Sequence, residues 1–225
     1  MRNYRIGMLF LLILIFPGRV ESEPGRGKEI HGHSHGTIGV EELSHRVLEE
    51  SLRLQQAGLN AIRREDYETA VRIFQRALEL TPSSLAIYNN IGVCEARRYR
   101  VGEAAAWFEK ARDMAPFDPL IAGNLGLMRG LQHRTDESYE LLAVSISRGG
   151  ATSAAQHYAM GLMELEKGHP SEGIRNLTTV DRNRFPYRDL FLSAAQRNMG
   201  RPGASQKSYR RFMDRYRAPW INATY

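Results

Sequence analysis

The chain has 225 residues, of which 42% are hydrophobic and 25% charged, and its formal net charge at pH 7 is +6. This length and apolar content are sufficient for one domain with a sizeable core. The single cysteine, Cys94, excludes an intramolecular disulfide and a metal site built from cysteines.

The segment Met1–Arg5 is basic, and an unbroken apolar run follows it from Ile6 to Phe16. Eleven helical residues reach about half way across a hydrocarbon core of about 30 Å. The pattern therefore predicts a secretory signal peptide over residues 1–22, cleaved before Glu23, and an exported protein that is periplasmic or secreted. The alternative is an uncleaved membrane anchor.

Residues 23–39 contain few apolar side chains and several glycines, which is typical of a flexible linker. His31, His33 and His35 alternate there with small residues, and such a segment can wrap imidazole nitrogens around Cu²⁺, Ni²⁺ or Zn²⁺. No acidic or thiol ligand completes the site, so a solvated, pH-sensitive tail is the alternative interpretation. We expect no other cofactor.

From residue 40 onward the apolar residues recur at helical spacing, while strand signals are weak because Val, Ile and Thr do not cluster in alternating runs. The pattern predicts an all-α fold. The first helices are expected near 40–64, 67–80, 84–97, 101–114, 119–131 and 135–148, and less regular ones near 171–181, 187–199 and 202–217.

A 34-residue period connects these helices. Gly58, Gly92 and Gly126 are separated by that interval, and so are the large residues Phe74, Phe108 and Leu142. Small residues facing large ones allow two helices to pack without a gap. Ala70 and Ala104, Ala77 and Ala111, and Pro82 and Pro116 repeat at the same interval.

This spacing resembles the tetratricopeptide repeat, a 34-residue helix-turn-helix unit. The resemblance is strongest over residues 51–118 and weaker over 119–217. It implies a right-handed superhelical solenoid over residues 40–217, with about five antiparallel units near 51–84, 85–118, 119–152, 154–186 and 187–217. Residues 218–225 are expected to form a tail.

The resemblance also implies that the first helix of each unit lines a concave groove. Asn89, Asn90 and Arg97 occupy groove positions of the second unit, Arg63 one of the first unit and Asn124 one of the third. An asparagine amide can pair with the backbone of an extended peptide, and arginine can bind a carboxylate or phosphate with two hydrogen bonds. The alternatives are a local hydrogen bond for the asparagines and simple solvation for the arginines.

Charge is concentrated at the C-terminal end, where residues 182–217 carry ten Lys or Arg against Asp189 and Asp214. This region could dock on an anionic lipid or polymer surface. We expect no nucleic-acid partner, because neither interleaved exposed aromatics nor a DNA-reading helix pattern is present.

The sequence contains no catalytic motif that its spacing would single out, so we expect no enzyme activity. The prediction is an exported scaffold or adaptor that binds a protein or an extended peptide in its groove, in an envelope, secretion or surface-assembly system. Docking on an anionic surface and metal binding by the histidine-rich linker are the alternatives. The sequence does not determine the oligomeric state.

Overall fold

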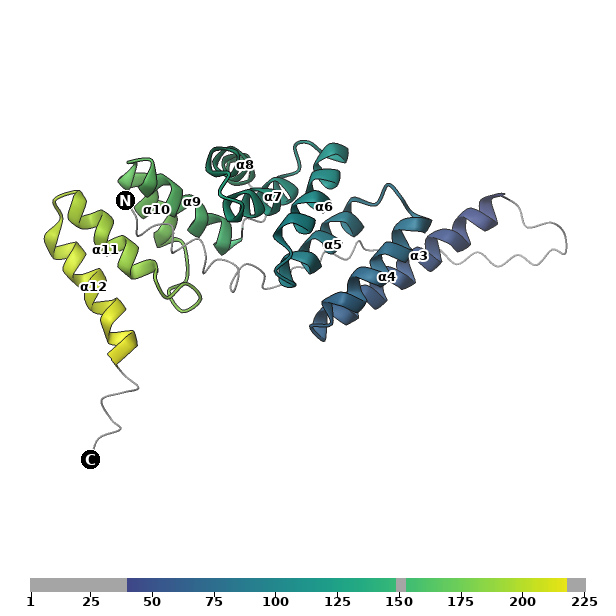
Figure 1. Ribbon diagram of the computed structural model, residues 1–225, viewed down its shortest axis with the longest axis horizontal. Helices are drawn as coiled ribbons and strands as arrows, with labels where there is room; N and C mark the ends of the chain where they lie inside the picture. The colour runs from purple at the N-terminus through teal and green to yellow at the C-terminus, as the bar shows by residue number, and fades with distance from the viewer. Residues whose placement is uncertain (1–39, 149–152, 218–225) are drawn as a thin grey trace, which may run out of the picture. The chain divides into compact units, whose positions relative to one another are not determined.

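The computed structural model describes residues 40–148 and 153–217, and in these two ranges it contains ten α-helices and no strand (Figure 1). The predicted all-α class is confirmed. The helices are α3 (Val40–Arg63), α4 (Tyr67–Leu80), α5 (Leu85–Arg97), α6 (Val101–Met114), α7 (Pro119–Leu131), α8 (Thr135–Ser147), α9 (Ala154–Glu166), α10 (Pro170–Thr178), α11 (Arg188–Asn198) and α12 (Pro202–Arg217).

The described helices form five consecutive pairs, and each pair is joined by a three-residue turn of the same conformation. The middle residue of every turn has a positive φ, between 60° and 83°. The first helix of the pair ends two residues before this left-handed residue, and the second begins two residues after it. The left-handed residues are Glu65, Tyr99, His133, Gly168 and Gly200.

Close contact between a glycine and a large side chain holds four of the pairs together. A Cβ atom on Gly92 would lie 2.6 Å from Cε1 of Phe108, and the same distance separates Gly58 from Phe74. Such approaches are possible only for a residue without a side chain. The corresponding pairs Gly126 with Leu142 and Gly161 with Leu177 extend the pattern, and all four large residues are fully buried.

Local capping explains where some helices begin. The Asp66 carboxylate accepts the backbone N–H of Thr69 at 3.1 Å, and this hydrogen bond lowers the Asp66 pKa from its usual value. Asp118 caps α7 in the same way, and Ser153 forms a capping box with Gln156 at the start of α9.

The described residues divide into two compact units, one that ends at residue 116 and one that begins at residue 117. In the first unit, α3 to α5 share one apolar core that includes Leu59, Val71, Phe74 and Ile91. The end of α4 is tied to α3 by a 2.7 Å hydrogen bond between the hydroxyls of Ser51 and Thr81.

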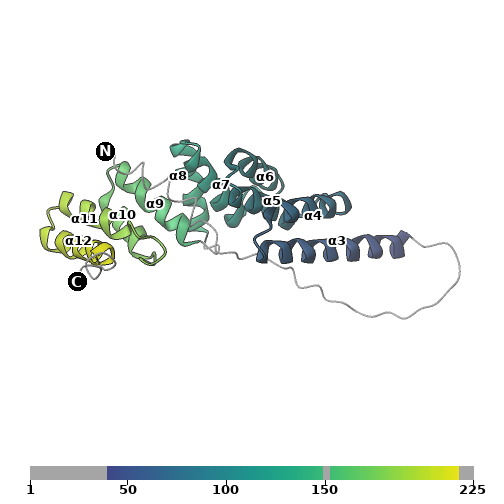
Figure 2. The same cartoon turned by 60° about the horizontal axis from the view of Figure 1, so that its bottom comes forward.

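The first turns of α3 project beyond the end of α4 in both views (Figures 1 and 2). Leu43 and Leu48 of this extension are 55% and 50% exposed. The extension therefore leaves apolar surface in solvent.

The second unit has its core around α7 and α9, in which almost every residue is buried. Ser138 and Ser145 of α8 donate hydrogen bonds to the backbone carbonyls of Gly126 and Pro119, both at 2.6 Å. Between α10 and α11 the chain forms an irregular segment whose Phe185 is buried and stacks near Tyr158, with ring centroids 4.7 Å apart. The helix expected over 171–181 spans Pro170–Thr178.

Candidate functional site

The structure places four of the predicted binding residues in the first compact unit. Asn89, Asn90 and Arg97 lie on α5, and Arg63 is the last residue of α3. Asn124 lies on α7, in the second unit. Nothing in the structure tests whether these residues bind a ligand, so their role stays a prediction.

The three asparagines are buried, with exposed fractions of 5% for Asn89, 4% for Asn90 and 5% for Asn124. Asn89 and Asn124 have interaction partners. The Asn90 side chain forms no hydrogen bond with any residue that the structure describes. Its amide atoms are not among the fully buried side-chain atoms that lack a partner in the described part of the chain, so solvent or a ligand can reach them.

The two arginines are more accessible than the asparagines. Arg63 is exposed, and its Nη1 donates to Oδ1 of Asn60 at 2.7 Å. Arg97 is half-buried, with its guanidinium carbon 6.0 Å from the centre of the Tyr67 ring. This cation–π contact orients the Arg97 side chain.

Other residues on the same two helices present apolar and amide surface. Leu52 of α3 is 39% exposed, Gln56 of α3 is exposed and Val93 of α5 is half-buried. The first unit thus offers apolar contacts, an amide and two guanidinium groups on its first helices.

A set of buried charged residues next to the turns was missed by the sequence analysis. Glu164 of α9 is 5% exposed and accepts hydrogen bonds from Tyr139 and His169, each at 2.9 Å. The first of these bonds raises the pKa of the Tyr139 hydroxyl. Glu95 and Arg129 occupy the equivalent positions of α5 and α7 and are also 5% exposed. Their recurrence at the repeat interval was the signal that could have found them.

These buried charges hold turns in place. The carboxylate of Glu95 contacts Arg98 at 3.3 Å and Arg100 at 3.9 Å, on either side of the left-handed Tyr99. Arg129 donates to Gln132 at 2.7 Å, also within a turn. The arrangement is that of a structural ion-pair network.

Cys94 is buried against the apolar core of the first unit. Burial raises the pKa of its thiol to about 12, with the neighbouring Glu95 as a second cause. A thiol with so high a pKa is not a nucleophile at neutral pH.

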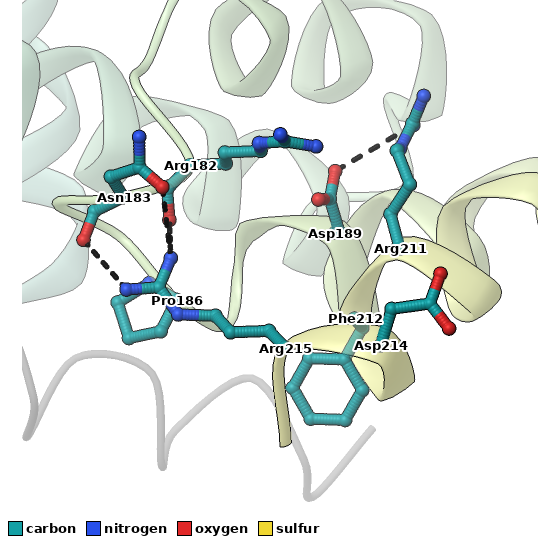
Figure 3. A pocket seen from close by; sticks show the side chains of 8 residues that line it. All are labelled: Arg182, Asn183, Pro186, Asp189, Arg211, Phe212, Asp214 and Arg215. Atoms are coloured by element: carbon teal, nitrogen blue, oxygen red, sulfur yellow. Dashed lines mark hydrogen bonds and ion pairs between the residues drawn. The ribbon is translucent and has the colours of Figure 1, made fainter. Parts of the chain in front are cut away.

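A pocket of about 510 Å³ lies in the second unit, between α12 and the segment that precedes α11 (Figure 3). The Arg215 guanidinium donates to the carbonyls of Arg182 and Asn183, at 2.8 and 3.0 Å, and so braces this segment. Asp189 is 3% exposed, and its Oδ1 lies 2.9 Å from Arg188 and 3.6 Å from Arg211. Arg211 and Arg215 therefore already have partners in the pocket wall: Arg211 pairs with the Asp189 carboxylate, and Arg215 binds two backbone carbonyls.

The predicted metal ligands His31, His33 and His35 lie outside the described residues, as do the predicted signal segment and the C-terminal tail. Within residues 40–148 and 153–217, no group of three or more His, Cys, Asp or Glu side chains is placed to hold a metal ion. The same part of the chain has no helix of the length and apolarity that a membrane span requires.

Comparison with known families gives the same repeat unit as the turns and the glycine contacts do. Residues 56–119, from α3 to the start of α7, match the tetratricopeptide repeat family model. This part of the chain therefore has the sequence pattern of tetratricopeptide repeats. No curated protein matches its sequence.

Solved structures with the same tetratricopeptide repeat fold cover most of the chain. A crystal structure of MamA protein is similar with a TM-score of 0.59 at 14% identity, over 79% of this chain and 98% of that one. MamA from Desulfovibrio magneticus RS-1 gives 0.60 at 14% identity, over 76% and 97%. PilF of Pseudomonas aeruginosa gives 0.60 at 20% identity, over 75% and 78%. At these identities the likeness establishes the fold, an all-α repeat solenoid, as the sequence predicted.

Proposed function

We propose that this protein is an exported, non-enzymatic scaffold or adaptor, and that it binds a partner protein or an extended peptide across the first helices of its repeats. The fold supports a role in protein–protein interaction. The basic start and apolar run of residues 1–16 support export and an envelope, secretion or surface-assembly context.

One observation carries the binding part of the proposal. Asn90 is 4% exposed, and its amide forms no hydrogen bond with any described residue and is not among the fully buried unpaired atoms, so it stays accessible to a ligand. A peptide backbone offers both a donor and an acceptor, and it would satisfy the amide. Val93 and Arg97, one and two turns further along the same helix, would add an apolar and a charged contact.

The test uses envelope extract from the native host and quantifies the proteins cross-linked to the tagged full-length chain. Asn90→Ala and Arg97→Ala should each reduce recovery of the principal partner by at least ten-fold. Arg76→Ala is the matched control, because Arg76 is an exposed arginine on α4, a second helix. Unchanged recovery with Asn90→Ala and Arg97→Ala, or equal loss with Arg76→Ala, would place the binding surface elsewhere.

The export part has its own test, which is mass spectrometry of the mature protein from its host. A chain that begins at Glu23 agrees with export through a cleaved signal. A chain that begins at Met1 and fractionates with membranes favours the uncleaved anchor, whereas a soluble cytosolic chain contradicts export.

A second candidate function is docking on an anionic lipid or polymer surface through the basic end. Arg197, Arg201, Lys207 and Arg210 are exposed and form no ion pair with any described residue. Attraction between exposed charges is screened over about 10 Å at 0.1 M salt and over only a few Å at 0.5 M. Binding to anionic vesicles that persists at 0.5 M salt would contradict this function.

Metal binding by His31, His33 and His35 remains a third candidate. Calorimetric titration of the full chain with Zn²⁺ and Cu²⁺ tests it, with His33→Ala as the variant. Affinity weaker than millimolar for both ions would remove it.

A further inference from the structure

The last helix pair exposes a position that is buried in every other pair. This position lies nine residues after the left-handed turn residue. In the first four pairs it is held by Phe74, Phe108, Leu142 and Leu177, all with an exposed fraction of 0%. In the last pair it is held by Tyr209, which is 44% exposed.

A second position, twelve residues after the turn residue, changes in the same direction. Ala77, Ala111, Ser145 and Val180 hold it in the first four pairs, and all are buried. In the last pair it is Phe212, which is half-buried. The Phe212 ring lies 6.4 Å from that of Tyr209 and 6.1 Å from that of Tyr187. At both positions the last pair therefore has an aromatic side chain that is more exposed than its counterparts in the other four pairs.

In an internal pair, the large side chain at this position packs on a glycine of its own pair and also belongs to a core shared with the following helix. Phe74 and Ala77 of α4 share one core with Ile87, Ile91 and Cys94, which form a stripe along α5 at spacings of four and three residues. Such a stripe is one face of an α-helix. Helix α12 has the corresponding face without an equivalent of α5 among the described residues.

Helices α12 and α4 also differ in their balance of charged residues. Helix α4 balances Arg72 and Arg76 against Glu68 and Glu79, whereas α12 sets five Lys or Arg against Asp214 alone. Lys207 and Arg210 are exposed and form no ion pair with any described residue. A helix that packs beside them would gain from carboxylates on its flanks.

We propose that α12 binds an amphipathic helix of a partner protein, in the place that α5 takes on α4. The bound helix carries apolar residues at i, i+4 and i+7, which cover Tyr209 and Phe212, and acidic residues that face Lys207 and Arg210. This site is separate from the surface on α3 and α5 in the proposed function, so either can fail alone.

The probe is a helix-stapled, fluorescein-labelled peptide of residues 85–97 in which Ala86, Val93 and Arg97 are replaced by glutamate. These positions are half-buried in α5 and lie outside its stripe of Ile87, Ile91 and Cys94. Fluorescence anisotropy with the full-length protein should show saturable binding. A second peptide with lysine at the same three positions should bind at least ten-fold more weakly.

Two variants separate docking from folding, and circular dichroism confirms that each is folded. Tyr209→Ala should weaken binding of the glutamate peptide at least ten-fold, whereas Tyr99→Ala, which removes a 61% exposed tyrosine outside α12, should leave it unchanged. The double variant Lys207→Glu, Arg210→Glu should reverse the preference between the two peptides.

Several results would overturn the proposal. Absence of binding by either peptide, or binding that is insensitive to Tyr209→Ala, excludes α12 as a helix-binding face. A protein that sediments as a dimer, and that becomes monomeric with Tyr209→Ala, assigns the face to a second copy of the chain.

Discussion

In the first helix pair, the positions of α3 that correspond to Ile87, Ile91 and Cys94 of α5 are held by Arg53, Ala57 and Asn60. Arg53 and Asn60 are exposed. The last pair differs, because its outward position keeps the aromatic Tyr209 and leaves it 44% exposed. The first pair therefore presents polar side chains where a preceding helix would pack. The last pair retains the apolar side chains that a following helix would cover.

This contrast shows that position within a repeat array determines the energetic role of a residue. A solenoid needs polar outer faces on its terminal units for solubility. The first pair meets this need at the positions of Arg53 and Asn60, although Leu43 and Leu48 near the start of α3 remain exposed. In the last pair, the exposed cations Lys207 and Arg210 flank Tyr209 in the sequence, and Tyr209 is 44% exposed.

The largest expected effect compares Phe108 with Tyr209, which hold the same repeat position. Phe108→Ala should lower the free energy of unfolding by about 3–5 kcal/mol, because it removes a fully buried ring. Tyr209→Ala should cost less than about 2 kcal/mol, because its ring is already 44% exposed. Urea unfolding followed by circular dichroism measures both. Equal losses would remove the distinction between an internal pair and the last pair.

The next effect concerns the glycine contacts inside a pair. Gly92→Ala should cost about 1–3 kcal/mol, since the new Cβ would lie 2.6 Å from the Phe108 ring in a packed core. Gly102→Ala is the matched control: no atom lies within 4 Å of its new Cβ, and alanine favours the helix by about 1 kcal/mol. Thermal unfolding of the two variants should shift in opposite directions.

These contacts belong to the part of the fold that the sequence predicts. Gly58, Gly92 and Gly126 recur at one interval with their large partners, and fixed spacing is visible without coordinates. The left-handed turns were less visible, because Glu65, Tyr99 and His133 are not glycines. The glycines at the equivalent positions 168 and 200 were the available signal.

The predicted fold class is confirmed, whereas the candidate site stays a prediction. The repeat register predicts that Asn90 and Arg97 lie on one helix, and both lie on α5. How deeply each side chain is buried depends on the neighbouring helices, and the spacing of residues does not reveal it. Likewise, the exposure of Tyr209 depends on which helices pack against it, and this too cannot be read from the spacing of residues. No residue in the sequence identifies the ligand, because recognition depends on the chemistry of a partner.

A smaller effect compares an internal turn with the last one. Tyr99 has a φ of 61° and its side chain is 61% exposed, so Tyr99→Gly should raise the free energy of unfolding by about 0.5–1 kcal/mol. Gly200→Ala, at a φ of 68° with open space around it, should lower that energy by about 1 kcal/mol. Urea midpoints that move in the same direction would contradict the conformational argument.

The smallest effect on stability at neutral pH comes from Cys94, which lies on α5 in the second pair. The equivalent position of α3 then allows a chemical test of the first pair. The thiol pKa is about 12 in the folded protein against a reference value of 9.0. Between these values the unfolded chain has lost the proton that the folded chain retains, so stability falls as pH rises from about 9 toward 12. At pH 7 both states are protonated, and the contribution is negligible.

The same burial should prevent labelling of native Cys94 by a thiol-reactive disulfide reagent at pH 8. Asn60 holds the equivalent position of α3 and is exposed. In a Cys94→Ala background, Asn60→Cys should therefore label at least a hundred-fold faster than native Cys94, because access and thiolate formation are both restored. Slow labelling of Asn60→Cys would show that another segment covers the leading face of the first pair, and the contrast between the two ends would then fail at α3.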